Sequence, residues 1–408
     1  MKFQFVEEKE GYTARIKVVG VGGAGGNAIN NMIAAKLRGV EFYSANTDIQ
    51  SLERSTCSHK IQLGVSVTKG LGAGADPEIG RQSAEENTNE IKEAVKGADM
   101  VFITAGMGGG TGTGACPVVA QQCKEDGALT VAVVTKPFKF EGDKRMRRAL
   151  EGIEKLKKEV DTLIIIPNER LKAVGGKNST FRELIVRADE VLLNAVKGIS
   201  DLIISSGFIN LDFADVKKVM EQMGTAIMGT GKAKGENRAT EAAKQAINSP
   251  LLEDISVHGA RGLLMNITGP SDMTMEEIDE ASNFIKGEVD SEAEIFWGVV
   301  FDENMGDEVM ITVIATGIDK EPEKKEREKE KVIKLRDVTP EDAKDPWTVR
   351  GSNGENLDIP TFQRVGPGGS STTLHREKEE PQPKRSFFKK GFFKENLDYP
   401  TFLRAKAD

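Results

Sequence analysis

The stretch that decides the fold is Thr104-Ala105-Gly106-Met107-Gly108-Gly109-Gly110-Thr111-Gly112-Thr113-Gly114, which directly follows the apolar run Met100-Val101-Phe102-Ile103. Six of the nine residues from Gly106 to Gly114 are glycine, so the backbone carries few Cβ atoms and can pass close to a ligand. The apolar run predicts a strand and residues 115–126 predict a helix, whose N-terminus favours an anion. A flexible linker is the simpler alternative, but a linker is not expected between a strand and a helix. The stretch therefore predicts a phosphate-binding loop.

Apolar runs and helical segments alternate on both sides of this loop. The pattern predicts strands at 16–20, 40–45, 99–104, 129–134 and 162–167, and helices at 27–36, 77–96, 115–126 and 144–160. Such alternation is typical of a largely parallel sheet covered on both faces, with ligands bound at the carboxyl ends of the strands.

A long amphipathic helix is predicted over 180–205, and the texture of the sequence changes after it. Residues 206–318 predict helices at 213–223, 238–248 and 274–285, and strands at 262–268, 293–301 and 308–315. The sequence therefore predicts an α/β fold in which a parallel-sheet domain is joined through a long central helix to a smaller α/β domain.

The composition sets limits on the kind of protein. A chain of 408 residues is long enough for two domains and an extension, and a net charge of −8 gives no general argument for nucleic-acid binding. The three cysteines form no paired framework or zinc motif, which favours a reducing cytoplasm. The N-terminus has no signal-peptide pattern, and no apolar stretch approaches the ~20 residues needed to cross a bilayer. We therefore expect any membrane association to be indirect.

The globular pattern stops at Asp319. Of the 27 residues from Asp319 to Asp345, 19 are charged with both signs mixed, which predicts a disordered linker. Residues 355–364 (ENLDIPTFQR) recur as residues 395–404 (ENLDYPTFLR) with eight of ten positions identical. Two short binding peptides on a tether explain this repeat, because linked motifs gain avidity. Residues 384–394 interleave basic and aromatic side chains, so direct contact with anionic lipid and weak attraction to DNA are alternatives to a plain linker there.

A second glycine motif offers a rival interpretation. Gly20-Val21-Gly22-Gly23-Ala24-Gly25 fits the dinucleotide fingerprint G-x-G-x-x-G, with Glu41 about twenty residues further on. However, Glu41 falls near the start of the second predicted strand, whereas the ribose-binding acid belongs at its end. Two glycine loops suit a nucleoside triphosphate better. The sequence contains no G-x-x-x-x-G-K-[ST], so backbone N–H groups, the Thr111 and Thr113 hydroxyls and a metal would meet the phosphate charge.

These motifs together resemble the tubulin/FtsZ family. Gly106 to Gly114 resembles the signature loop, and four other motifs follow the FtsZ pattern in order: residues 20–27, Asn46-Thr47-Asp48, Pro167-Asn168-Glu169 and residues 210–215. The resemblance covers residues 12–318 and resumes in the tail repeat. It implies an N-terminal extension (1–14), a GTP-binding domain (15–179), a central helix (180–205), a GTPase-activating C-terminal domain (206–318), a charged linker (319–354), a first C-terminal peptide (355–364), a linker with the basic and aromatic segment (365–394) and a second C-terminal peptide (395–404).

The resemblance also implies a set of GTP- or GDP-binding residues, with Mg²⁺ at the phosphates and no metal ligand assigned. The phosphates would be held by Gly22, Gly23, Ala24, Gly25, Gly26 and Asn27, and by Gly108, Gly109, Gly110, Thr111, Gly112, Thr113 and Gly114. Thr135, Pro137 and Glu141 would flank the ribose, with Arg145 facing ribose or phosphate. Asn46, Ala73, Asn168 and Asp189 would form the base pocket, where Asp189 accepts from the guanine N1–H and N2–H₂ groups.

Two of these positions carry alternatives. Arg145 has a simpler explanation as a solvated helix arginine among several basic neighbours. The family has an aromatic residue four positions before the base-binding acid, whereas this sequence has Ile185. Base stacking is therefore weaker here, or Phe181 substitutes from one turn earlier.

Asn210, Asp212 and Asp215 are the predicted catalytic residues. They fall where a loop enters a helix, so carboxylates there can orient and polarise an attacking water. The simpler alternative is an N-cap at Asp212 and a first-turn acid at Asp215. The resemblance implies that this loop inserts into the nucleotide site of the next subunit, which gives an open head-to-tail filament.

The leading expectation is a self-assembling GTPase that forms the cell-division ring in the cytoplasm at mid-cell. Its tail peptides at 355–364 and 395–404 would bind an actin-like membrane-tether protein and other division adaptors, and no nucleic acid is required. A nicotinamide-dependent oxidoreductase and a nucleotide-binding scaffold without catalysis are the alternatives.

Overall fold

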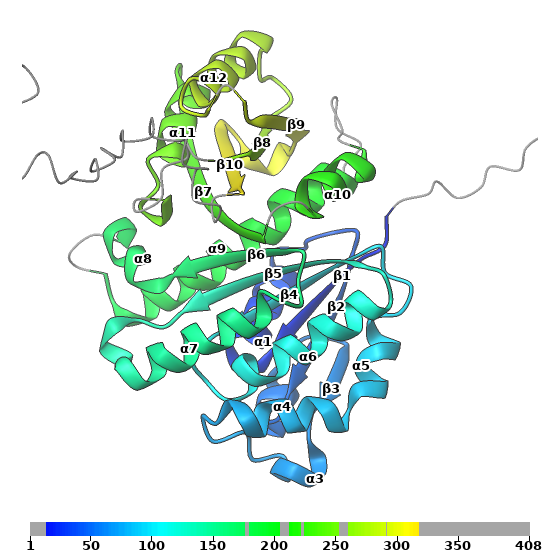
Figure 1. Cartoon of the computed structure of the whole chain (residues 1–408). Helices are drawn as coiled ribbons and strands as arrows, with labels where there is room; N and C mark the ends of the chain where they lie inside the picture. The colour runs from blue at the N-terminus through cyan, green and yellow to red at the C-terminus, as the bar shows by residue number, and fades with distance from the viewer. Residues whose placement is uncertain are drawn as a thin grey trace, which may run out of the picture. The chain divides into compact units, whose positions relative to one another are not determined.

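A ten-stranded sheet forms the frame of the computed structural model, which describes residues 14–175, 179–204, 212–221, 224–252, 260–290 and 292–317. The strand order is β3-β2-β1-β4-β5-β6-β7-β10-β8-β9. Figure 1 shows the helices that cover it. The strands are β1 (Ile16–Val21), β2 (Val40–Asn46), β3 (His59–Gln62), β4 (Met100–Gly106), β5 (Leu129–Lys136), β6 (Thr162–Pro167), β7 (Gly224–Lys234), β8 (Gly262–Gly269), β9 (Glu294–Phe301) and β10 (Glu308–Thr316).

The α-helices alternate with the strands in the first half of the chain, as predicted. They are α1 (Gly22–Ala34), α2 (Ile49–Arg54), α3 (Val65–Thr68), α4 (Pro77–Glu86), α5 (Thr88–Val95), α6 (Thr111–Glu125), α7 (Asp143–Leu156), α8 (Asn168–Gly175), α9 (Phe181–Ile204), α10 (Phe213–Glu221), α11 (Arg238–Ile247) and α12 (Met275–Gly287). Short 3₁₀ turns are η1 (Lys139–Glu141), η2 (Pro250–Leu252) and η4 (Glu303–Met305).

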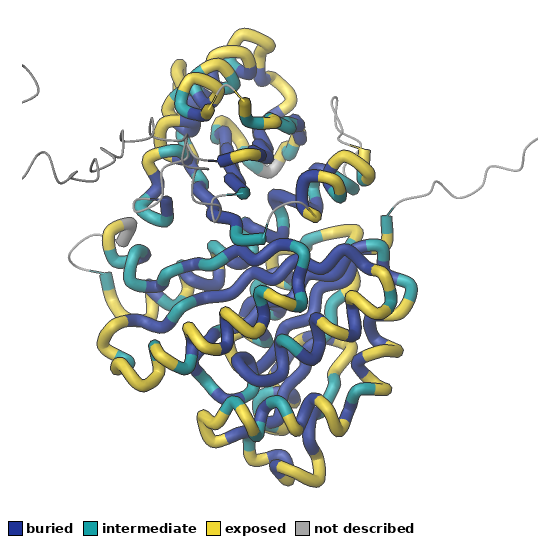
Figure 2. The backbone as a smooth tube through the Cα atoms, in the orientation of Figure 1, coloured by how far each residue is buried: buried dark blue, intermediate teal, exposed yellow. Residues whose placement is uncertain are grey.

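Strands β1 to β6 are parallel throughout, and β1, β4, β5 and β6 are buried on both faces, whereas β3 and the start of β2 are partly exposed. In β1 the side chains alternate: Ile16 and Val18 pack with α1, α9 and α10, whereas Val19 and Val21 pack on the side of α5, α6 and α7. Figure 2 shows the resulting buried strands between exposed helix surfaces. This two-sided burial explains why the strands read as continuous apolar runs.

The prediction that residues 77–96 are largely helical is confirmed, and the segment is divided into two helices. It breaks into α4 and α5 at Asn87, whose side-chain oxygen accepts from the Gly64 N–H at 2.7 Å and whose amide donates to Glu90 at 2.8 Å. Asn side chains that bond to nearby backbone compete with the helical pattern, which accounts for the break.

Strand β7 was not predicted, because its sequence GTAIMGTGKAK contains three glycines. The structure supplies the reason for two of them: a Cβ on Gly229 or Gly231 would collide with the backbone of α11. β7 also joins the two parts of the sheet, since it pairs in parallel with β6 and antiparallel with β10. β10 then pairs antiparallel with β8, and β8 in parallel with β9.

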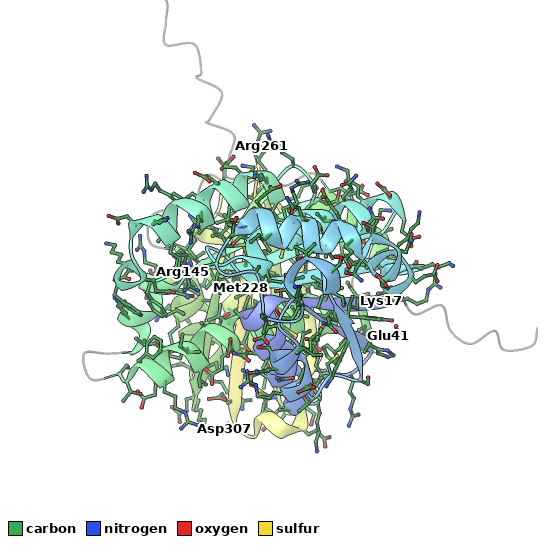
Figure 3. The ribbon with its side chains drawn as sticks, turned by 90° about the horizontal axis from the view of Figure 1, so that it is seen from below. Lys17, Glu41, Arg145, Met228, Arg261 and Asp307 are labelled. Atoms are coloured by element: carbon green, nitrogen blue, oxygen red, sulfur yellow. The ribbon has the colours of Figure 1, made fainter. Side chains whose placement is uncertain are left out.

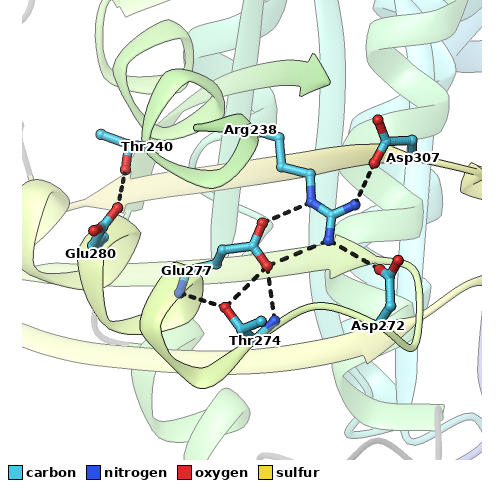
Figure 4. A network of polar contacts seen from close by, with 7 residues as sticks. All are labelled: Arg238, Thr240, Asp272, Thr274, Glu277, Glu280 and Asp307. Carbon is cyan, nitrogen blue, oxygen red and sulfur yellow. Dashed lines mark hydrogen bonds and ion pairs between the residues drawn. The ribbon is translucent and has the colours of Figure 1, made fainter. Parts of the chain in front are cut away.

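A buried arginine ties together the far part of this second region. Arg238, at the start of α11, bonds to Glu277 of α12 and to Asp272 and Asp307, which lie in loops before α12 and β10 (Figure 4). Glu277 is also the third residue of a capping box with Thr274 at the start of α12. The network therefore fixes two helices and two loops around one guanidinium group.

Helix α9 runs from the carboxyl ends of the parallel strands to their amino ends. Its first residue, Phe181, contacts Phe140, which follows the carboxyl end of β5, with ring centroids 5.7 Å apart. Its last residue, Ile204, packs against Gly39, which directly precedes β2. The long central helix predicted over 180–205 is thus confirmed over Phe181–Ile204.

Several predictions lie outside the described residues. These are the N-terminal extension up to residue 13, the charged linker, both tail peptides, the basic and aromatic segment 384–394, and Asn210. Within the described ranges, none of the helices combines the length and the apolar character of a bilayer span. The predicted domain boundaries remain a prediction.

Candidate functional site

The two glycine segments meet where the strand order reverses. β1 pairs with both β2 and β4, so the β1–α1 and β4–α6 connections leave the sheet side by side. A Cβ on Gly22 would lie 3.0 Å from the Gly112 nitrogen, which places the N-termini of α1 and α6 in contact. In open α/β sheets a ligand binds at this switch point, outside the carboxyl ends of the strands.

Both helices begin earlier than predicted, so part of each glycine segment is helix rather than loop. α1 begins at Gly22 instead of residue 27, and α6 begins at Thr111 instead of residue 115. The first N–H groups of a helix have no acceptor within it, and the positive end of the dipole lies there. The correction therefore strengthens the case for an anion site, because two helix N-termini converge on one place.

The predicted phosphate-binding glycines serve two different purposes. A Cβ on Gly25 or Gly114 would collide with the backbone of Thr104 or Pro77, so these glycines allow close packing. By contrast, a Cβ on Gly23 or Gly109 would meet no atom within 4 Å. Gly23 and Gly109 thus border open space beside the converging helix N-termini, where a phosphate chain fits.

The threonine hydroxyls of α6 also differ in their roles. Thr113 is buried and its hydroxyl accepts from the Gly108 N–H at 2.8 Å, which stabilises the loop, and its contact with a phosphate stays a prediction. The Thr111 hydroxyl lies 2.6 Å from that of Thr47, which follows β2. Thr47 was quoted in the Asn46-Thr47-Asp48 motif but was not predicted as a site residue.

Asn46 and Ala73 lie at the phosphate end of the site. The side-chain oxygen of Asn46 accepts from the Asp48 N–H at 3.2 Å and is adjacent to Thr47, while a Cβ on Gly110 would stand 2.7 Å from the Ala73 Cβ. Both residues therefore lie near the start of α6, and their role in a base pocket stays a prediction.

The end of β5 and the segment that follows it carry Thr135, Pro137, Glu141 and Arg145. The Thr135 carbonyl accepts from the Met107 N–H, which joins this segment to the glycine loop. Glu141 is engaged on both oxygens, since it accepts from the Phe138 N–H at 2.8 Å and pairs with Arg145 at 3.1 Å. Arg145 is therefore half-exposed and paired, not simply solvated, and its backbone packs against Gly108.

Two buried polar side chains line the far end of the site with bonding capacity to spare. Asn168 follows β6 and is buried, and its side-chain oxygen has no partner among the described residues. Asp189, on α9, is 8% exposed and accepts a hydrogen bond from the Asn31 amide at 3.3 Å. The pKa of Asp189 is raised to about 6, mainly by burial; the Asn31 hydrogen bond lowers it and the nearby Glu190 raises it. Orphaned buried oxygens of this kind are typical of a site that binds a ligand with N–H groups.

An aromatic cluster lies beside this end of the site. Phe138 and Phe140 stack with centroids 5.1 Å apart, Phe181 meets Phe140 edge-on, and the Lys172 ammonium lies over both Phe138 and Phe140. Phe140 and Phe181 are about 60% exposed. The substitution of Phe181 for the aromatic residue missing at Ile185 stays a prediction.

The predicted catalytic acids lie on the side of the sheet where the parallel strands begin, opposite the glycine loops. Asp212 and Asp215 are exposed at the start of α10, and Asp212 accepts from the Ala214 N–H at 3.3 Å, which is the N-cap expected as the simpler alternative. α10 is anchored where the parallel strands begin: the hydroxyl of Thr162, the first residue of β6, donates to the Met220 carbonyl at 2.6 Å (Figure 1). Neither acid forms an ion pair with any residue that the structure describes.

Glu41 does not lie where a dinucleotide-binding fold needs its ribose-binding acid. Glu41 pairs in register with Lys17 near the start of β2, and its carboxylate lies 3.9 Å from the Lys17 ammonium. Figure 3 shows the two side chains near each other. The ribose-binding acid of a dinucleotide fold belongs at the carboxyl end of β2. Position 41 was thus correctly judged unsuitable.

Two family models match the chain. The GTPase domain of the Tubulin/FtsZ family matches residues 15–176, and the C-terminal domain of the FtsZ family matches residues 224–319. The cell division protein FtsZ of Pseudomonas aeruginosa is 48% identical over 402 residues, which cover 97% of this chain and 98% of that protein. The one from Magnetospirillum gryphiswaldense is 56% identical over 304 residues, 74% of this chain, and the chain spans about half of its length (54%).

Solved structures give the same result. An empty FtsZ dimer of M. jannaschii is 47% identical, with a TM-score of 0.73 over 76% of this chain and 90% of that chain. CetZ2 from Haloferax volcanii, a GTPγS-bound protofilament, is 18% identical with a TM-score of 0.64 over 76% of this chain and 94% of that chain, and shares the fold.

Proposed function

Because the chain belongs to the FtsZ family of tubulin-like cell-division proteins, we propose that it is a GTPase that assembles head-to-tail into filaments and hydrolyses GTP between adjacent subunits. In this proposal the N-termini of α1 and α6 hold the triphosphate, and the buried oxygens of Asn168 and Asp189 receive the base. The filaments form the division ring at mid-cell.

The residues present fit the triphosphate end of GTP. Main-chain N–H groups at two helix N-termini supply donors and positive potential, and the open space beside Gly23 and Gly109 leaves room for the phosphate chain. Mg²⁺ would neutralise phosphate charge when it is bound with the nucleotide. The Thr47 and Thr111 hydroxyls are the candidate oxygen ligands from this chain.

The residues at the far end fit guanine. The Asp189 carboxylate can accept from guanine N1–H and N2–H₂, whereas adenine offers an acceptor at N1. Asn168 provides an amide with an unpartnered oxygen. This end of the site would therefore select guanine nucleotides.

The observation that carries the proposal is the position of α10. The strands of the parallel sheet separate α10, which is joined to the start of β6 through Met220, from the glycine loops, and β6 alone extends about 20 Å. Asp212 cannot reach a nucleotide held by its own chain across that length. Two exposed acids without a described partner suit a neighbouring nucleotide site, and an interface between opposite edges of one chain repeats without closing.

In the proposed reaction, Asp212 of one subunit orients a water molecule against the γ-phosphate held by the next. The carboxylate accepts the water proton, the water oxygen bonds to the γ-phosphorus, and the bond to the β–γ bridging oxygen breaks to give GDP and phosphate. Asp215, in the first turn of α10, would add a second carboxylate that can interact with a metal bound with the nucleotide. Asn210 is proposed to complete the loop and lies outside the described residues.

The tail is proposed to connect the filaments to the membrane. Residues 355–364 and 395–404 each carry apolar anchors next to charges, which is typical of peptides that fold on binding. We propose that they recruit an actin-like membrane-tether protein and other division adaptors. The chain itself would then remain cytoplasmic and associate with the membrane through these partners.

Substitutions at position 212 separate the cap from the chemistry. Asn caps a helix as well as Asp does, whereas Ala costs about 1 kcal/mol of helix stability. We expect Asp212→Asn to keep the stability and GTP affinity of the wild type and to lose at least about a hundredfold in turnover. Asp212→Ala should lose the same turnover and some stability. Wild-type turnover in Asp212→Asn would remove this residue from the mechanism.

A mixing experiment tests the shared site. Gly109→Val fills the open space without a predicted clash, so it should block GTP binding but leave Asp212 intact. Gly109→Val and Asp212→Asn should each be inactive alone. An equimolar mixture of the two should recover about one quarter of wild-type phosphate release, since one interface in four combines an intact glycine loop with an intact Asp212. Gly287→Val, which also faces open space but lies on α12, is the matched control and should behave as wild type. A mixture with no recovered activity, although both variants co-assemble, would contradict hydrolysis between subunits.

A further inference from the structure

The buried carboxylate of Asp189 has a single protein donor. The Asn31 amide, on α1, donates to one Asp189 oxygen at 3.3 Å, and it is the donor that the described residues supply. A carboxylate has about four lone-pair sites, so most of its capacity is left for a ligand. Burying a carboxylate is costly without such bonds, which makes the single donor important.

We propose that Asn31 is a positioning residue for base recognition, which orients the Asp189 carboxylate and keeps it ionised so that it accepts the two adjacent N–H groups of guanine. This inference rests on the proposed GTP binding and deepens it, since it assigns guanine selectivity partly to a residue of the phosphate-binding helix. Asn31 lies outside every motif that the sequence analysis used.

The geometry of α1 supports the assignment. Gly23, Asn27 and Asn31 follow one another at four-residue spacing, so they lie on one face of the helix. Gly23 borders the open space at the phosphate end, and Asn31 is two turns further, about 12 Å along the axis. The same helix face therefore leads from the phosphate end of the site to Asp189.

The electrostatics give Asn31 a measurable effect. The pKa of Asp189 is raised to about 6, mainly because burial desolvates the carboxylate; the Asn31 bond opposes this shift and Glu190 on the same helix adds to it. From α1, the group that faces Asp189 is the neutral Asn31 amide. Loss of this bond must therefore raise the pKa of Asp189 towards neutral pH, where a protonated carboxyl group no longer accepts both guanine donors.

The sign of the pH dependence follows from this shift. Guanine recognition needs the ionised carboxylate, so GTP affinity in the wild type should fall as pH falls through about 6. In Asn31→Ala the midpoint should move to higher pH. In Asn31→Asp a second carboxylate faces the first, so the midpoint should move further in the same direction.

The experiment measures the affinity of the full-length chain for GTP and ITP between pH 5 and 8, with wild type, Asn31→Ala and Asn31→Asp. ITP lacks the 2-amino group, so the ratio of the two affinities reports the second hydrogen bond. The phosphates titrate alike in every variant, so differences between variants belong to the base site. We expect Asn31→Ala to lower GTP affinity about tenfold at pH 7, to reduce the preference for GTP over ITP, and to shift the midpoint upward.

Asn30→Ala is the matched control. Asn30 is the preceding residue of α1, and its side-chain oxygen accepts from Ser55 and Thr56 instead of contacting Asp189. This substitution perturbs the helix but should leave the pH midpoint unchanged. A midpoint and a GTP/ITP ratio in Asn31→Ala equal to those of the wild type would overturn the inference while the proposed GTP binding stands. A wild-type chain that binds neither nucleotide at any pH would instead refute the proposed function.

Discussion

Replacing Arg238 tests how the second part of the structure is held together. Its side chain is 7% exposed and pairs with Glu277, which is 18% exposed, and with Asp272 and Asp307, which are 74% and 68% exposed. These exposures differ enough to predict which partner matters. We consider Arg238→Ala, Asp307→Asn and a double variant that removes the charges of Arg238 and Glu277 together.

The expected magnitudes follow from burial. An exposed ion pair contributes about 0–1 kcal/mol, so Asp307→Asn should cost less than about 1 kcal/mol. Breaking a buried pair costs about 3–5 kcal/mol because it leaves the partner buried and unpaired, so Arg238→Ala should cost about that much. In the double variant Arg238→Met with Glu277→Gln, no charge is stranded and Gln keeps the capping box of α12, so most of the loss should be recovered.

The assay is equilibrium unfolding in urea followed by tryptophan fluorescence. The chain has two tryptophans, and Trp347→Phe leaves Trp297 of β9 as the reporter of this region. The free energies of unfolding should rank wild type and Asp307→Asn together, then the double variant, then Arg238→Ala. Equal losses for Asp307→Asn and Arg238→Ala would refute the reasoning from burial.

The pH dependence gives a second test of the same network. The hydrogen bond from Arg238 is the main cause that lowers the pKa of Glu277. A depressed folded-state pKa stabilises the fold above the unfolded value of about 4.3, and this contribution is lost as pH falls through the folded-state pKa. The acid-dependent part of the unfolding free energy should therefore be smaller in the double variant than in the wild type.

Three further predictions concern the first part of the chain. Gly114→Ala should destabilise the fold by several kcal/mol, measured by urea unfolding, because its Cβ would collide with the Pro77 carbonyl; a loss below about 1 kcal/mol would contradict this packing. Gly23→Val should abolish binding of a fluorescent GTP analogue at unchanged stability, because Gly23 borders open space; unchanged affinity would move the phosphate site elsewhere. The thiols of Cys57, Cys116 and Cys123 should resist a thiol reagent until the chain unfolds, since all three are buried and burial raises the pKa of each. Rapid labelling of any one of them in the native protein would disprove this.

Much of the parallel sheet could be predicted because its strands are local signals. Each of β1, β4, β5 and β6 is a short apolar run, and the glycine segments mark the ends of β1 and β4. β7 could not be recognised, because two of its glycines are required by close packing against the backbone of the following helix α11, and the local sequence gives no sign of this packing. The sequence predicts the starts of α1 and α6 too late, because glycines that allow close packing at a helix start look like a loop in the local sequence.

The glycine segments of the candidate site could be located from the sequence, whereas the roles of individual side chains could not. The Gly106–Gly114 segment carries its own signal, but Thr113 and Gly114 turned out to serve packing, which depends on neighbours distant in sequence. Asn31 was missed because its partner Asp189 is 158 residues away. The signal that could have found it is its four-residue spacing from Asn27, which places both on the same face of α1.

The length of α9 has a consequence for any polymer of this chain. Its 24 residues rise about 36 Å, from Phe181 near the carboxyl ends of the parallel strands to Ile204 near their amino ends. Subunits that stack edge to edge in the proposed manner would therefore have an axial repeat no shorter than this helix. A periodicity in electron micrographs of roughly 40 Å would match a single molecule standing upright along the strand.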